Sequence, residues 1–191
     1  KLNTTIYKLI KYIEKNGDSI IEDFNIILNE DNQFEFTVEG TKRLRFLADV
    51  YGYKTIDEMK EKEEELVDAT AKDVVEYLGG SGKFAIGDYE VEGDSSTEFI
   101  VGKGYTNKEL LQMVTIRYAM WLTSYRKYIG TTVATDISDE TVAVIMENIV
   151  ELEGVSIEED TVRRYTEDSQ YFAHILGYTG KISSDELDEL N

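Results

Sequence analysis

The segment Ser124-Tyr125-Arg126-Lys127 has the spacing S-x-x-K, which on a helix places a serine hydroxyl one turn from a lysine that can influence its proton. Such a pair could support serine acyl-enzyme chemistry. That chemistry also requires an S-x-N or S-D-N element and a K-T-G or K-S-G element, and neither occurs anywhere in the sequence. We therefore interpret the segment as part of an ordinary helix with one buried and one exposed side.

The segment Gly82-Lys83-Phe84 ends like a phosphate-binding loop. In such a loop a serine or threonine follows the lysine, and another glycine stands five positions before the last one. Here the residue after the lysine is phenylalanine and the earlier position is Tyr77. The segment therefore predicts a flexible turn and not a nucleotide site.

The acidic segment from Asp88 to Gly93 resembles the opening of a calcium-binding loop, in which alternate carboxylates and a glycine bend the chain around a hard cation. The position of the bidentate carboxylate is occupied by Phe99, and Glu98 comes one residue too early. A solvated acidic hairpin is the favoured interpretation. A binding module stabilised by calcium stays open as an alternative.

His174 is the only histidine of the chain, and it lies beside the apolar residues Phe172, Ile175 and Leu176. A single histidine excludes a metal site made of several histidines, and this apolar setting favours a hydrogen-bonded histidine at a packing junction.

The chain has 39 acidic residues, so some pair of carboxylates is always available for glycoside hydrolysis. An acidic hydrolase of cell-wall glycan is thus a second alternative.

The composition limits the partners of this 191-residue chain. Its formal net charge of −19, with only 20 lysine and arginine residues, argues against binding nucleic acid or an anionic membrane surface. Cysteine is absent from the sequence, so there is no disulfide or thiolate metal site, and no cofactor is expected.

No apolar run reaches the ~20 residues that span a bilayer. Both ends look cut, and we expect a membrane anchor outside this chain.

Periodicity and capping residues predict helices and hairpins in an α+β arrangement, either as one compact unit or as two lobes. A helix is expected from Leu2 to Ile13, with Gly17 after its end, and a hairpin from Phe24 to Val38 turns at residues 29–32. The range from Lys83 to Gly104 is expected to be extended and rich in loops.

Hydroxyl residues mark further helix starts. Capping boxes begin helices at Thr55 and Thr106, and the second helix is apolar around much of its circumference, so it is expected to be the central buried helix. Thr70 caps a short helix that ends at Leu78. A strand is expected from Thr131 to Thr135. Two more helices are expected to begin at Ser138 and Ser183.

The most specific stretches lie near the C-terminus: Gly154 to Ile157, Arg163-Arg164-Tyr165, and Ala173 to Ser183. Their order and spacing resemble the end of the pedestal, or dimerisation, domain of class B penicillin-binding proteins. Ile116-Arg117-Tyr118 is also similar to that family, and the resemblance is strong from about residue 110 to 187. Thr166 departs from it, because the family usually has proline after the arginine-tyrosine pair.

The resemblance implies a pedestal-domain fold over residues 1–191, with a head-like lobe over roughly 1–105 and the family-matching part over roughly 106–191. It implies a non-catalytic fragment of a membrane-anchored, penicillin-binding D,D-transpeptidase that acts in peptidoglycan synthesis and cell shape outside the cytoplasm. The implied partners are its own transpeptidase domain, a SEDS-type glycosyltransferase, other elongation or division proteins, and a second copy in a homodimer. The residues expected at structural or interaction positions are Arg117, Gly154, Arg163, Arg164, Tyr165, His174, Gly177, Tyr178 and Gly180.

Overall fold

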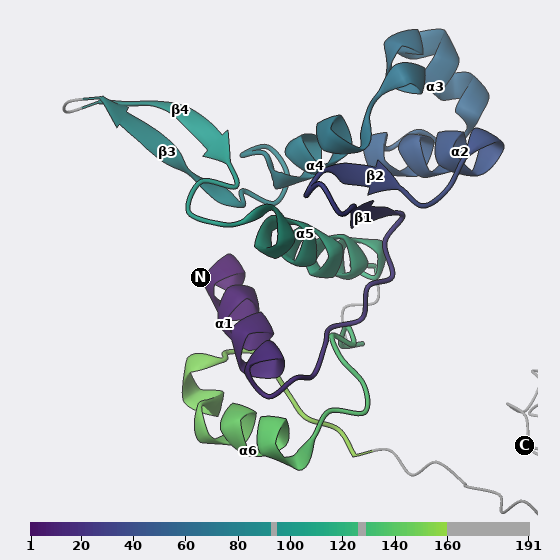
Figure 1. Cartoon of the computed structure of the whole chain (residues 1–191). Helices are drawn as coiled ribbons and strands as arrows, with labels where there is room; N and C mark the ends of the chain where they lie inside the picture. Colours follow the sequence, from purple (N-terminus) through teal and green to yellow (C-terminus); the bar gives the residue numbers. More distant parts are fainter. Residues whose placement is uncertain (93–94, 126–128, 160–191) are drawn as a thin grey trace, which may run out of the picture. The chain divides into compact units, whose positions relative to one another are not determined.

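The computed structural model of the chain describes residues 1–92, 95–125 and 129–159 (Figure 1). It groups the chain into two compact units, Lys1–Val155 and Ser156–Asn191, and the elements below belong to the first. The described residues form six α-helices and two antiparallel two-stranded sheets, so the predicted α+β class is confirmed. The boundary between two lobes near residue 105 stays a prediction.

Helix α5 (Asn107–Leu122) lies at the centre of the first unit and contacts α1 (Leu2–Lys15), α4 (Ala71–Gly79) and β1 (Ile26–Leu28) (Figure 1). It begins with the predicted capping box, in which Thr106 accepts from the amide of Glu109 and the Glu109 carboxylate accepts from the amide of Thr106. Seven of its sixteen side chains are buried, in agreement with the predicted central helix. They are Leu110, Gln112, Met113, Val114, Thr115, Ile116 and Tyr118.

Helix α1 packs on α5 and on α6 (Asp139–Glu147), which Ser138 caps through the amide of Thr141. Its buried face repeats every three or four residues, as predicted for an amphipathic helix. That face consists of Ile6, Leu9, Ile10 and Ile13. A short 3-10 helix, η2 (Ile149–Glu151), follows α6.

The predicted first hairpin is formed by β1 and β2 (Phe34–Phe36), and its turn depends on Asn29. The Asn29 side chain accepts from the amides of Asp31 and Gln33 at 3.0 and 2.9 Å, which fixes the turn locally. Edge-to-face ring contacts then join this region to the helices and close the core. The rings are those of Phe24, Phe36, Phe46 and Tyr118.

Helix α2 (Gly40–Tyr51) was not predicted. Its N-cap Glu39 makes no side-chain capping bond, so the usual start signal is absent. The spacing of the buried Phe46, Leu47 and Val50, followed by Gly52 at φ +86°, could have revealed it.

Two further capped helices agree with the sequence. Thr55 caps α3 (Ile56–Lys62), and Thr70 forms a full capping box with Asp73 at the start of α4. Between them lies the 3-10 helix η1 (Glu64–Asp68).

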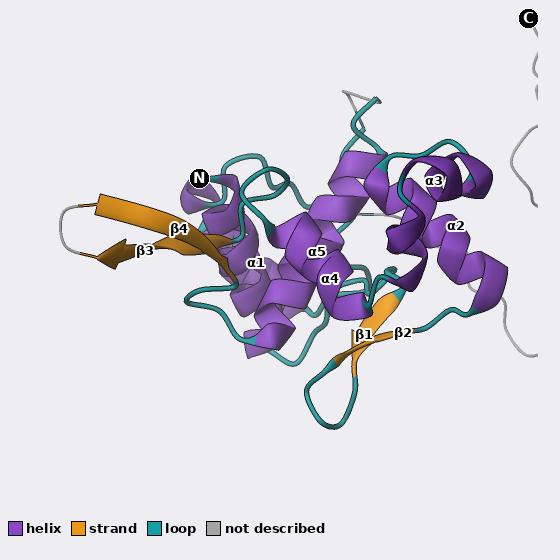
Figure 2. Cartoon of the chain, turned by 90° about the horizontal axis from the view of Figure 1, so that it is seen from above, coloured by secondary structure: helices purple, strands orange, loops and turns teal. Residues whose placement is uncertain are grey.

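The second hairpin, β3 (Gly87–Glu92) with β4 (Ser95–Val101), extends away from the helices (Figures 1 and 2). It confirms that Lys83 to Gly104 is extended, and it is the acidic hairpin favoured over a calcium loop. Among the described residues, no group of three or more histidine or acidic residues could hold a metal ion.

The strand predicted from Thr131 to Thr135 is wrong, since residues 131–135 have no strand in the structure. From the described residues the segment receives one backbone bond, donated by the Ile21 amide to the Val133 carbonyl at 2.8 Å. Its β-branched residues favour extended backbone, but a strand also needs a partner that forms a ladder. The helix expected after Ser183 lies outside the described residues.

Candidate functional site

Two of the nine residues predicted from the family pattern, Arg117 and Gly154, belong to the described residues. Arg163, Arg164, Tyr165, His174, Gly177, Tyr178 and Gly180 lie outside them, so their roles stay predictions. The structural or interaction roles of Arg117 and Gly154 likewise stay predictions.

Gly154 follows η2 at φ +86°, a left-handed conformation that glycine adopts without steric cost. The preceding η2 is tied to α1 by an ion pair between Lys8 and Glu151, whose Nζ and Oε2 atoms lie 2.5 Å apart. At the other end of α6, Asp18 accepts from the Ser138 hydroxyl at 2.7 Å and from its amide at 3.0 Å. These contacts hold η2 to α1 and the start of α6 to the segment that follows α1.

Arg117 lies on α5 and is half-buried, with its guanidinium carbon 5.2 Å from the centre of the Phe84 ring. Burial lowers the pKa of the guanidinium from its usual value. It forms no ion pair within the described residues. Its cationic group is therefore held by an aromatic face and not by a carboxylate.

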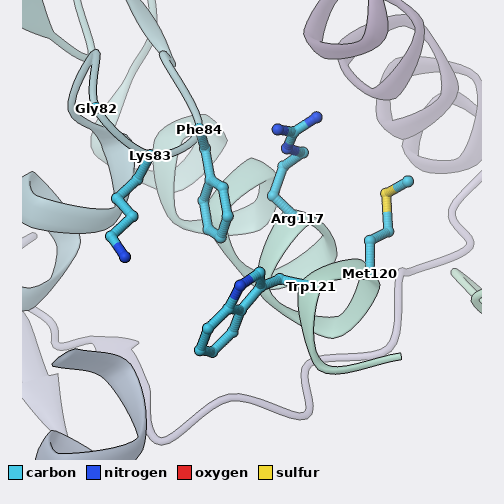
Figure 3. A pocket seen from close by; sticks show the side chains of 6 residues that line it. All are labelled: Gly82, Lys83, Phe84, Arg117, Met120 and Trp121. Carbon is cyan, nitrogen blue, oxygen red and sulfur yellow. The ribbon is translucent and has the colours of Figure 1, made fainter. Parts of the chain in front are cut away.

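A surface pocket of about 370 Å³ lies beside Arg117 (Figure 3). Its second cation is Lys83, whose Nζ lies 5.9 Å from the Trp121 ring centre and 5.0 Å from that of Tyr77. The Phe84 and Trp121 rings lie between Lys83 and Arg117 in this view. We call this the cation–aromatic pocket; its lining residues are Gly82, Lys83, Phe84, Arg117, Met120 and Trp121.

Backbone bonds hold the loop that forms one wall of the pocket. The Phe84 amide donates to the Leu78 carbonyl at 3.0 Å, and the Ile86 amide donates to Gly79 at 2.8 Å. From α1, the Asn3 side-chain amide donates to the carbonyls of Phe84 and Ala85 at 2.9 and 2.8 Å. The loop is thus fixed to α4 and to α1. It forms the turn that the sequence predicted for Gly82 to Phe84.

Sequence reasoning missed this pocket. The sequence predicted a turn at Gly82 to Phe84 and a helix that begins at Thr106, without relating the two segments to each other. No local pattern relates residues 82–84 to residues 117–121, because packing of α4 against α5 brings them together.

The position of Ser124 corrects the interpretation of the S-x-x-K segment as helical. Helix α5 ends at Leu122, and Ser124 lies exposed in the following turn, where its amide donates to the Trp121 carbonyl at 3.2 Å. The Thr123 hydroxyl bonds back to the Ala119 carbonyl, which competes with continuation of the helix. Lys127 lies outside the described residues.

Glu109 ties the start of α5 to α1. Its carboxylate pairs with Lys11, accepts from the Thr106 amide at 2.8 Å, and accepts from the Tyr7 hydroxyl at 3.2 Å. The bonds from Lys11 and then Thr106 lower the pKa of Glu109 from 4.5 to about 2. The side chain is only 12% exposed, so its charge is weakly screened by water.

Glu109→Gln is expected to lower the free energy of unfolding at pH 7 by about 1–2 kcal/mol, after allowance for the exposed Lys11. The pKa is depressed in the folded state, so the stabilisation is complete above the unfolded pKa near 4.5 and is lost as the pH falls towards about 2. Urea unfolding of both proteins from pH 7 to pH 3 measures this. The difference should shrink below pH 4.5, and Glu30→Gln, at an exposed turn, should show little effect at any pH. A difference that is constant with pH would contradict the assignment.

The fold and the pocket define a mixed α+β domain whose surface presents two cations on aromatic faces. A family model described as the penicillin-binding protein dimerisation domain matches residues 2–191, so the chain belongs to this family. The dimerisation domain is a non-catalytic part of such proteins, and it places the chain in the context of cell-wall synthesis. No curated protein matches the chain. Among the helices with described residues, none is both long and apolar enough to cross a membrane.

Proposed function

We propose that this chain is the non-catalytic pedestal of a peptidoglycan D,D-transpeptidase and that it works at the extracytoplasmic face of a bacterial membrane. The observation that carries the proposal is the family match, which extends over residues 2–191. In this proposal the parent protein supplies a membrane anchor and a penicillin-binding transpeptidase domain. The pedestal positions that domain and influences crosslinking and cell shape without performing the reaction.

The contacts of α5 support a role as a stiff spacer. This helix packs on α1, α4 and β1, and ion pairs fix its first turn to α1 through Lys11–Glu109 and Lys108–Glu14. Segments distant in the sequence are thereby joined to one buried helix. An element of this kind transmits position with little internal motion, because packed interiors have low compressibility.

The proposed protein partners are a SEDS-type glycosyltransferase and other proteins of elongation or division, with a second copy of the chain as a further candidate. The family description supports protein contacts in general, since it names a dimerisation domain. The net charge of −19 favours protein partners over nucleic acid.

Replacement of this domain within the parent protein tests the proposal. The parent should be expressed once without residues 2–191 and once with an unrelated rigid domain of similar size in their place. Both forms should still be acylated by a fluorescent penicillin, whereas the isolated chain should not be labelled at Ser124. Neither form should restore cell-wall synthesis in cells that lack the parent, because the partner contacts are missing.

Each alternative gives a different result. Restored growth with the unrelated spacer would show that length alone matters and would contradict the contact role. Covalent labelling of the isolated chain would contradict its assignment as non-catalytic.

A further inference from the structure

The two cations of the cation–aromatic pocket have no carboxylate partner among the described residues, although the chain is strongly acidic. The chain contains 39 acidic residues against 20 lysine and arginine residues, so carboxylate partners are plentiful. Yet neither Lys83 nor Arg117 pairs with a carboxylate in the described part of the chain. Both instead lie over aromatic rings that border one hollow, at 5.9 Å from Trp121 and 5.2 Å from Phe84.

The pocket also exposes apolar surface. Trp121 is 40% exposed and its neighbour Leu122 is 50% exposed, at the end of a helix whose middle, from Gln112 to Ile116, is buried. Tryptophan and arginine are the residue types that most often carry binding energy at protein interfaces. The Phe84 ring beneath them is buried, and its loop is fixed by bonds to α4 and α1, so the surface is formed before any partner arrives.

We infer that the cation–aromatic pocket binds an acidic segment of a partner protein, with an apolar side chain against Trp121, one carboxylate paired with Lys83 and another paired with Arg117. This inference rests on the proposed function as a contact platform and adds the surface and the chemistry of the partner. A second copy fits less well, because two chains of charge −19 repel each other. A carboxylate is favoured because both cations keep donors that no described carboxylate uses.

Trp121 provides a direct probe, because it is the only tryptophan of the chain. In the ¹⁵N-labelled chain its indole N–H gives one signal, which can be followed during titration with a blocked pentapeptide that alternates glutamate with leucine and phenylalanine. Two control peptides separate the contributions: one has glutamine for glutamate, and the other has glycine for the apolar residues. The acidic apolar peptide should shift the signal saturably, and its affinity should fall as salt is added.

A pair of variants with equal charge change completes the test. Lys83→Gln should weaken binding of the acidic peptide about threefold to tenfold, since one charge-assisted contact is lost. Lys60→Gln, on the exposed side of α3, should leave binding unchanged. Arg117→Gln should weaken binding at least as much as Lys83→Gln. Far-ultraviolet circular dichroism checks that each variant is folded.

Several results would overturn the inference. They are a Trp121 signal that does not move, equal binding of the glutamine peptide, and equal effects of Lys83→Gln and Lys60→Gln. A shift that depends on the concentration of the chain alone would assign the pocket to self-association instead. None of these results changes the penicillin acylation of the domain-replaced parent, so failure here is distinct from failure of the proposed function.

Discussion

Met113→Ala is expected to lower the free energy of unfolding by about 2–5 kcal/mol, because it removes a fully buried side chain from the centre of α5. Alanine is at least as good a helix former as methionine, so the loss comes from packing and not from the backbone. For a chain of this size such a loss corresponds to a melting temperature lower by about 5–15 °C. Urea unfolding followed by circular dichroism measures it.

Met146→Ala is the matched control, since Met146 also lies in a helix but is 57% exposed. Its effect should stay within about 0.5 kcal/mol. If both substitutions cost the same, α5 is not the buried centre of the domain. A loss below about 1 kcal/mol for Met113→Ala would contradict the packing in the same way.

Gly87→Ala is expected to destabilise pairing of the β3–β4 hairpin by about 3 kcal/mol, from backbone strain together with overpacking. Gly87 has φ +149°, and a Cβ placed there would lie 2.1 Å from the backbone oxygen of Ile100. A backbone atom cannot rotate away as a flexible side chain can, so β4 must move. Beyond its base, where Val101 meets Gly79 of α4, the hairpin extends away from the helices, so we expect it to open locally while the helices stay folded.

Amide hydrogen exchange distinguishes this local opening from global unfolding. Amides of the β3–β4 ladder should exchange roughly 100-fold faster in Gly87→Ala, the change that corresponds to about 3 kcal/mol. Amides within α5 should be unaffected. Gly82→Ala is the control, because a Cβ at Gly82 meets no atom within 4 Å. Unchanged exchange in the hairpin would show that the strands accommodate a side chain at this position.

Elements whose signals are local can be predicted from the residue pattern alone. At the start of α5, the Thr106 hydroxyl accepts from the Glu109 amide, and the Glu109 carboxylate accepts from the Thr106 amide. Because both bonds lie within one helical turn, a four-residue pattern is sufficient to place the start of the helix. The Asn29 turn and the apolar face of α1 were also predicted, because the residues that define each lie within one turn or one helix. Helix α2 was missed because Glu39 gives no such local start signal.

Features that depend on partners far away in the chain are set by how the elements pack. The segment from Thr131 to Thr135 has strand-forming residues, but a ladder requires a second segment, and within the described residues the segment has a single backbone bond, from Ile21. The cation–aromatic pocket likewise joins Lys83 and Phe84 to Arg117 and Trp121 through the packing of α4 on α5. The physical reason is that burial and cation–aromatic contacts depend on distances in space. Within one helix or turn, residue spacing fixes these distances. Between two separate elements it does not.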